Sequence, residues 1–236
     1  MLKRRAGALA LAAALVALPQ PAWAADGGVR LDFESGPDKR SAADPWTSGC
    51  FDTAAGNACV HTTGGGGLDA VGHGDGTAVR FPGSGTAVIE VPHDASLNPG
   101  RSDFTISATV RLPAGKVKSG ANLIQKGSFD SGQWKLQVDG GIPTCRLNGR
   151  TEERAARAEV VAGDSIADGE WTTLRCIREG SRLRLTVDGE EVDSAGSADL
   201  DIGSTEPLTI GGKHTGGDND QFRGDLDDVG VDITPG

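Results

Sequence analysis

The sequence has no tyrosine, one methionine, four tryptophans and six phenylalanines in 236 residues. Flat aromatic platforms for stacking on a sugar ring are therefore limited to a few side chains. No Cys-x-x-Cys pair occurs, so the four cysteines lack the usual spacing of a zinc site. Apart from residues 6–18, no apolar run approaches the roughly 20 residues of a membrane-spanning helix. These absences argue against a zinc site and against membrane insertion.

Basic residues are too few to balance the acidic ones. The chain has 23 Lys and Arg against 33 Asp and Glu, which gives a formal net charge of −10. A broad basic patch for nucleic acid or anionic lipid is therefore not expected, and no nucleic-acid partner is predicted. The acid excess is compatible with bound divalent cations or simply with a soluble surface, and composition alone leaves both open.

The first 24 residues have the features of a cleaved secretory signal peptide. A basic start (Lys3–Arg5) precedes the apolar run Ala6–Leu18, and Ala22–Ala24 supplies small residues around a cleavage point. Cleavage removes three basic and no acidic residues, so the mature chain 25–236 has 212 residues and a formal charge of −13. We therefore predict a secreted, extracellular monomer that folds as one domain.

The clearest β pattern lies in Gly169–Gly189. Apolar and polar residues alternate on both sides of Gly180, which is typical of strands with one buried and one solvated face. Gly180 and Asp188–Gly189 are typical turn positions. The segment is therefore predicted to be a β-meander in which Leu174 and Cys176 face the core.

Shorter alternating segments predict further strands along an all-β chain. Phe104–Leu112, with five apolar residues in alternation, is predicted to be central in its sheet. Two hairpins are expected, one from Thr77–Phe81 and Thr86–Val91, the other from Leu123–Gln125 and Gln133–Val138. Ser35–Asp75 is rich in Gly, Asp, Ser and Thr and is expected to be a long loop.

Four cysteines in an exported protein predict two disulfides. Three pairings are possible, and proximity favours Cys50 with Cys59, inside the long loop, and Cys145 with Cys176, between neighbouring strands. Trp46 lies in the same loop, where it either stacks on a sugar or packs against the loop itself. It is the predicted ligand-binding residue.

Several of these segments together resemble one known family. They are Asp168–Trp171 followed by Leu185–Gly189, then Asp103–Leu112, Leu123–Gly127 with Gln133–Val138, Pro207–Gly212 and Phe222–Val231. In this order they resemble the laminin-G-like jelly rolls of the concanavalin A-like lectin/glucanase superfamily, over Val29 to the C-terminus. The resemblance implies a two-sheet antiparallel β-sandwich (jelly roll) of about a dozen or more strands.

The resemblance also bears on catalysis and metal binding. The family's glucanases carry an active strand of the form Glu-x-Asp-x-x-Glu, and no such run occurs here. Members often hold a structural Ca²⁺ between the first and last strands. By that resemblance Asp227 is the predicted side-chain ligand, completed by oxygens near Asp32 or Glu34, against the alternative of a solvated acidic face.

The predicted function is therefore that of a secreted, non-catalytic module that recognises an extracellular or cell-surface carbohydrate. Two alternatives remain: a protein-interaction or structural module that binds a surface protein, and a glycan-processing enzyme whose carboxylates come from distant strands. Fold alone does not choose among them, because function depends on the site that the fold carries.

Overall fold

The computed structural model describes residues 28–39, 45–115, 117, 119–197 and 199–234. The predicted signal peptide, residues 1–24, lies outside the described residues. The described residues form two 3-10 turns, η1 (Pro37–Lys39) and η2 (Ala95–Leu97), and sixteen strands. The strands are β1 (Val29–Leu31), β2 (Cys50–Thr53), β3 (Gly56–Thr63), β4 (Asp69–His73), β5 (Gly76–Arg80), β6 (Thr86–Val91), β7 (Phe104–Arg111), β8 (Ala121–Ser128), β9 (Gly132–Asp139), β10 (Ile142–Arg150), β11 (Ala155–Val161), β12 (Trp171–Glu179), β13 (Arg182–Val187), β14 (Glu190–Gly196), β15 (Leu208–Ile210) and β16 (Asp225–Ile233).

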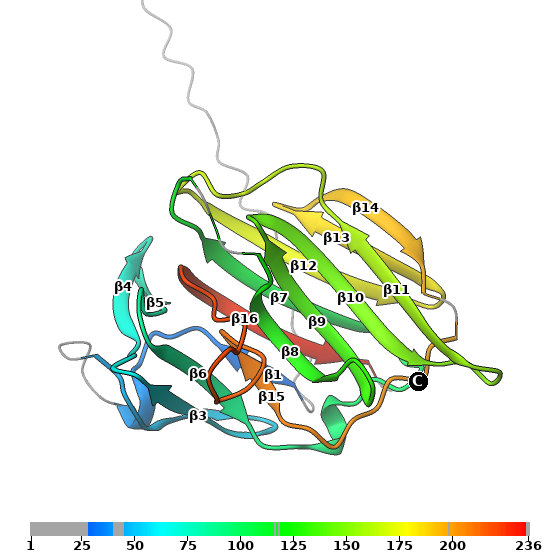
Figure 1. The fold of residues 1–236 in the computed structure, drawn as a ribbon, viewed down its shortest axis with the longest axis horizontal. Coiled ribbons are helices and arrows are strands. Elements are labelled where there is room, and N and C mark those ends of the chain that lie inside the picture. The colour runs from blue at the N-terminus through cyan, green and yellow to red at the C-terminus, as the bar shows by residue number, and fades with distance from the viewer. Residues whose placement is uncertain (1–27, 40–44, 116, 118, 198, 235–236) are drawn as a thin grey trace, which may run out of the picture.

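The strands form two eight-stranded antiparallel sheets packed as a sandwich, which confirms the predicted fold class (Figure 1). The first sheet has the order β14-β13-β12-β7-β16-β5-β4, with β1 also paired to β16. The second sheet has the order β11-β10-β9-β8-β15-β6-β3-β2. Figure 1 shows β8 to β11 crossing in front of β12, β7 and β16. No helix among the described residues is long and apolar enough to cross a membrane.

The predicted β-meander forms β12, β13 and β14. Leu174 and Cys176 are fully buried, as the alternation requires. Gly180 turns β12 into β13 at φ 52°, and Asp188 and Gly189 turn β13 into β14 with φ 51° and 87°. Two consecutive positive φ angles are the signature of the tight hairpin turn whose twist matches that of the flanking strands.

The predicted central strand is β7, which pairs with β12 on one side and β16 on the other. Its inward residues Ile106, Ala108 and Val110 are fully buried. Burial of each large apolar side chain contributes about 1.5–3 kcal/mol. The hairpin of β8 and β9 also forms as predicted, with Trp134 and Leu136 in the core.

Two expectations are corrected. Thr77–Phe81 and Thr86–Val91 do not form a hairpin: β5 pairs with β4 and β16 in the first sheet, whereas β6 pairs with β3 and β15 in the second. The connection Pro82–Gly85 therefore crosses between the sheets. Within Ser35–Asp75, the expected loop, the chain forms β2, β3 and β4 instead, because long-range pairing stabilises short strands whose own pattern is weak.

Both predicted disulfides are present. Cys50 and Cys59 are cross-strand neighbours in the β2–β3 hairpin. Cys145 lies on β10 and Cys176 on β12, so this bridge joins the two sheets through the core rather than neighbouring strands as expected. The inward alternation of both strands places the two sulfurs opposite one another.

Candidate functional site

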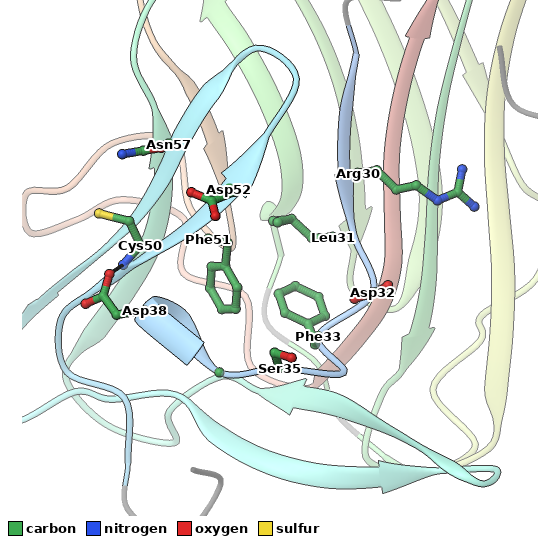
Figure 2. Close-up of a pocket in the computed structure, with 11 residues that line it drawn as sticks. Arg30, Leu31, Asp32, Phe33, Ser35, Asp38, Cys50, Phe51, Asp52 and Asn57 are labelled. Atoms are coloured by element: carbon green, nitrogen blue, oxygen red, sulfur yellow. Dashed lines mark hydrogen bonds between the residues drawn. The ribbon is translucent and has the colours of Figure 1, made fainter. Parts of the chain in front are cut away.

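A pocket of about 510 Å³ opens where β1 of the first sheet approaches the β2–β3 hairpin of the second (Figure 2). It is lined by Arg30, Leu31, Asp32, Phe33, Ser35, Gly36, Asp38, Cys50, Phe51, Asp52 and Asn57. Its volume lies within the roughly 300–1,000 Å³ of small-molecule sites. Residues from the first strand and from the disulfide-closed hairpin therefore meet in one place although they are distant in sequence.

The floor of this pocket is aromatic. The rings of Phe33 and Phe51 pack edge to face with centroids 5.5 Å apart, and Trp46 packs edge to face against Phe51 at 5.9 Å. Phe33 adopts a φ of 53°, which is unusual for a bulky side chain and costs about 1–3 kcal/mol. Phe33 is 1% exposed and Phe51 8%, so both rings belong to the core beneath the pocket.

The rim is polar, and part of it supports the walls. Asp38 Oδ1 accepts a hydrogen bond from the Cys50 amide at 3.1 Å, which ties η1 to the hairpin. Asp32 Oδ1 accepts from the Glu34 amide at 3.3 Å. In the view of Figure 2 the two phenylalanine rings lie between Asp52 and Asp38 on one side and Asp32 on the other.

Asp52 and Asn57 are the rim residues best placed to meet a ligand. They are cross-strand partners in the hairpin, and both side chains are exposed. Neither forms a side-chain hydrogen bond or ion pair with another described residue. A carboxylate supplies acceptors and an amide supplies both donors and acceptors, which suits the hydroxyl groups of a sugar. Sequence inspection missed this pair because it treated the hairpin as a loop.

The expectation that Trp46 forms a ligand platform is corrected. Its side chain is 2% exposed, and its backbone pairs with Leu68. The alternative, packing against its own segment, is what the structure shows. The ring is buried because it covers Phe51, so its apolar area belongs to the core rather than to a binding surface.

Asp227 lies outside this pocket, on the outer face of the first sheet. His73 Nδ1 is 2.6 Å from Asp227 Oδ2, and Asp227 Oδ1 accepts from the Asp228 amide at 2.8 Å. Burial raises the pKa of Asp227, and these two hydrogen bonds oppose the rise. Its carboxylate is therefore occupied by protein partners.

The predicted calcium ligands come near one another without forming a ligand set. β1 pairs with the end of β16, with Leu31 opposite Val229, so Asp32 does approach the last strand. However, Glu34 accepts from the Thr77 amide at 3.2 Å, and Asp227 contacts a histidine nitrogen. Among the described residues no three His, Cys, Asp or Glu side chains are grouped to hold a metal ion. Ca²⁺ takes about six to eight oxygen ligands, and these side chains do not form such a set. The calcium site stays a prediction.

A polar row also crosses the outer face of the second sheet. The register aligns Thr209, Gln125, Lys135, Arg146 and Glu159 on five adjacent strands. Arg146 forms an ion pair with Glu159. Lys135 is 9% exposed; burial first, and then the charge of Arg146, lower the pKa of its ammonium group to about 8.

This lowered pKa predicts a pH dependence of stability. Between pH 8 and pH 10.5 an unfolded chain binds a proton at Lys135 that the folded chain does not, so the free energy of unfolding rises with pH in this window. We expect a rise of about 1–2 kcal/mol, after allowance for solvent screening. Urea unfolding of wild type and Lys135→Gln at both ends of the window measures it. The variant should lack the rise and Lys213→Gln should keep it; the same slope in all three proteins would contradict the assignment.

A family model described as the concanavalin A-like lectin/glucanases superfamily matches residues 83–231. Among solved structures, the chain is similar to the binding domain of Paraclostridial Mosquitocidal Protein 1, with 18% identity and a TM-score of 0.60 over 83% of this chain and 51% of that one. It is also similar to domain 4 of AbnA, a GH43 extracellular arabinanase from Geobacillus stearothermophilus, solved in complex with arabinotriose. That match has 17% identity and a TM-score of 0.57 over 76% of this chain and 84% of that one.

A third similar structure is the binding domain of botulinum neurotoxin DC in complex with rat synaptotagmin II. The match has 13% identity and a TM-score of 0.55, and covers 75% of this chain and 43% of that one. The chain thus spans about half the length of the toxin binding domains that it matches. At these sequence identities the similarity shows a shared fold and no more.

Proposed function

Because the chain belongs to the concanavalin A-like lectin/glucanases superfamily, we propose that it is a secreted, non-catalytic module that binds carbohydrate. The observation that carries the proposal is the pocket of about 510 Å³, at whose rim the exposed Asp52 and Asn57 side chains form no hydrogen bond or ion pair with another described residue. Sugars present hydroxyl groups, and the carboxylate and amide at this rim supply acceptors and donors for them.

The neighbours support a binding role in general terms. One is a domain of an arabinanase solved with arabinotriose, and another is a toxin binding domain solved with a protein, synaptotagmin II. The fold therefore accommodates both sugar and protein partners, and a surface protein is the alternative ligand. The pocket favours sugar because its rim supplies hydrogen-bonding groups around a small concavity, rather than a broad exposed apolar patch.

A non-catalytic role is supported by how the carboxylates are used. A glycosidase needs two carboxyl groups on either side of the scissile bond, one acting as an acid with a raised pKa. Of the three carboxylates in this pocket, Asp38 and Asp32 accept hydrogen bonds from backbone amides, and Asp52 lies exposed at the rim. Asp227, whose pKa burial raises, lies on the outer face of the first sheet with His73.

Retention on insoluble polysaccharides and cell walls tests the proposal. Residues 25–236 should be retained on at least one neutral polysaccharide, and Asp52→Ala/Asn57→Ala should weaken retention at least about tenfold. Asp164→Ala, which removes one exposed charge between β11 and β12, should behave as wild type. No retention by the wild-type protein, or equal retention by all three, would exclude this pocket as the site.

The same experiment examines calcium and catalysis. Retention and thermal stability are measured with added Ca²⁺ and again with chelator. Loss of either with chelator would support a structural Ca²⁺, and no change in either would contradict the predicted calcium site. Release of reducing ends from the retained polysaccharide would contradict the non-catalytic role.

A further inference from the structure

A second pocket, of about 540 Å³, lies where β5 and β7 end and β16 begins. Three arginines line it: Arg80, Arg111 and Arg223. Its apolar lining includes Phe81 and Leu112, both buried. This pocket is separate from the one proposed above, with which it shares no lining residue.

The sheet register sets two of the arginines around one buried carboxylate. Arg111, Asp225 and Arg80 are direct neighbours on β7, β16 and β5. Asp225 is 3% exposed. Arg80 Nε and Nη2 donate to its two oxygens at 2.7 and 3.1 Å, and Arg111 Nε and Nη2 both donate to Oδ2, at 2.8 and 2.5 Å. The carboxylate therefore fixes both guanidinium groups and neutralises the charge of only one.

The third arginine and an aromatic ring complete the frame. Arg223 donates to the carbonyl oxygens of Pro82 and Gly85 at 2.5 and 3.2 Å, so it is held by the connection between the sheets. The guanidinium of Arg111 lies 4.7 Å from the ring centroid of Trp171, which supports it by a cation–π contact. All three cationic groups are thus held in place before any ligand arrives.

The charge of this pocket is opposite to that of the chain. Its lining holds three arginines and one aspartate, an excess of two positive charges in a protein of formal charge −10. Asp69, the partner of Arg80 on β4, adds one acidic group beside the pocket and leaves the local balance positive. Each guanidinium uses part of its N–H donors on the contacts above, which leaves others for a ligand. Planar arginine forks match a carboxylate in two parallel hydrogen bonds.

We propose that this pocket binds the carboxylate of an acidic sugar, such as a uronic acid residue of an acidic polysaccharide. The preference for an anion follows from the three arginines. The choice of a sugar as its carrier rests on the proposed carbohydrate role, and the volume suits a sugar ring.

Binding of polygalacturonate and of its methyl-esterified form tests the proposal, because esterification removes the charge and keeps the chain. The wild-type protein should bind the acidic form at least about tenfold more tightly, with an affinity that falls as salt is raised. Arg80→Gln should lose at least about tenfold in affinity for the acidic form, and Arg80→Lys should lose less because it keeps the charge without the fork. Arg154→Gln, an exposed arginine elsewhere, should match wild type.

Arg223→Gln is the second variant if Arg80→Gln fails to fold, with circular dichroism as the check. Equal binding of the two forms of the polymer, or equal binding by Arg80→Gln and Arg154→Gln, would overturn the proposal. Binding of dextran sulfate without binding of polygalacturonate would overturn the carboxylate assignment in favour of sulfate. Retention on neutral polysaccharides and its dependence on Asp52 and Asn57 report the first pocket independently, so either site can fail alone.

Discussion

Replacing both Cys145 and Cys176 with alanine is expected to lower the free energy of unfolding by about 3–4 kcal/mol, as estimated from closure of a loop of 31 residues. For a domain of this size such a loss lowers the melting temperature by roughly 7–15 °C. Both cysteines are fully buried and join the two sheets, so alanine also leaves space between them. Thermal unfolding followed by circular dichroism measures the change.

The matched control is the other disulfide. Cys50 and Cys59 are 9 residues apart and are already neighbours in a hairpin, so Cys50→Ala/Cys59→Ala should cost about 2.5 kcal/mol or less. Equal losses in the two double variants would contradict the view that the bridge between the sheets contributes more.

Substitution of Arg178 by methionine is expected to cost about 3–5 kcal/mol of unfolding free energy. The side chain is 1% exposed, and its guanidinium donates to the carbonyl oxygens of Ser102, Leu200 and Gly100 at 3.0, 2.9 and 2.9 Å. Methionine keeps much of the apolar stem and removes the donor of all three carbonyl groups; Gly100 O still accepts from the Ile202 amide at 3.0 Å, so the groups left short are those of Ser102 and Leu200. Each unsatisfied buried group costs about 1–3 kcal/mol.

Two comparisons separate the hydrogen bonds from the charge. Burial lowers the pKa of Arg178, because the charged guanidinium is costly to bury. The side chain therefore stabilises the fold through the hydrogen bonds that it donates to the carbonyl groups. Arg178→Lys keeps the charge without the fork and should lose an intermediate amount. Arg154→Met, at an exposed position, should change stability by less than about 0.5 kcal/mol. Urea unfolding curves in which Arg178→Met matches Arg154→Met would refute the structural role.

Local sequence pattern predicted those elements whose signal is itself local. The alternation in Phe104–Leu112 and in the segment around Gly180 gave the correct strands and the correct inward residues, because side chains on a strand point to opposite faces in turn. The turn residues Gly180, Asp188 and Gly189 have the positive φ angles that their types favour. Proximity of the cysteines was enough to identify both disulfides.

The candidate sites depended on pairing between distant strands. Alternation indicates which face a residue occupies, but it does not indicate which strand lies beside it. Asp225 meets Arg80 and Arg111 only because β16 inserts between β5 and β7. Trp46 packs its ring against Phe51 of β2 and pairs its backbone with Leu68, which are contacts that local pattern does not indicate.

The sequence by itself therefore determined the fold class, the disulfide pairs, the inward faces of the strong strands and the resemblance to a superfamily of lectins and glucanases. The tertiary structure decided that Thr77–Phe81 and Thr86–Val91 belong to different sheets, that Cys145–Cys176 crosses the core, and that Asp227 contacts His73. The physical reason is that strand order and register come from contacts far apart in the chain, whose combined burial outweighs local preference.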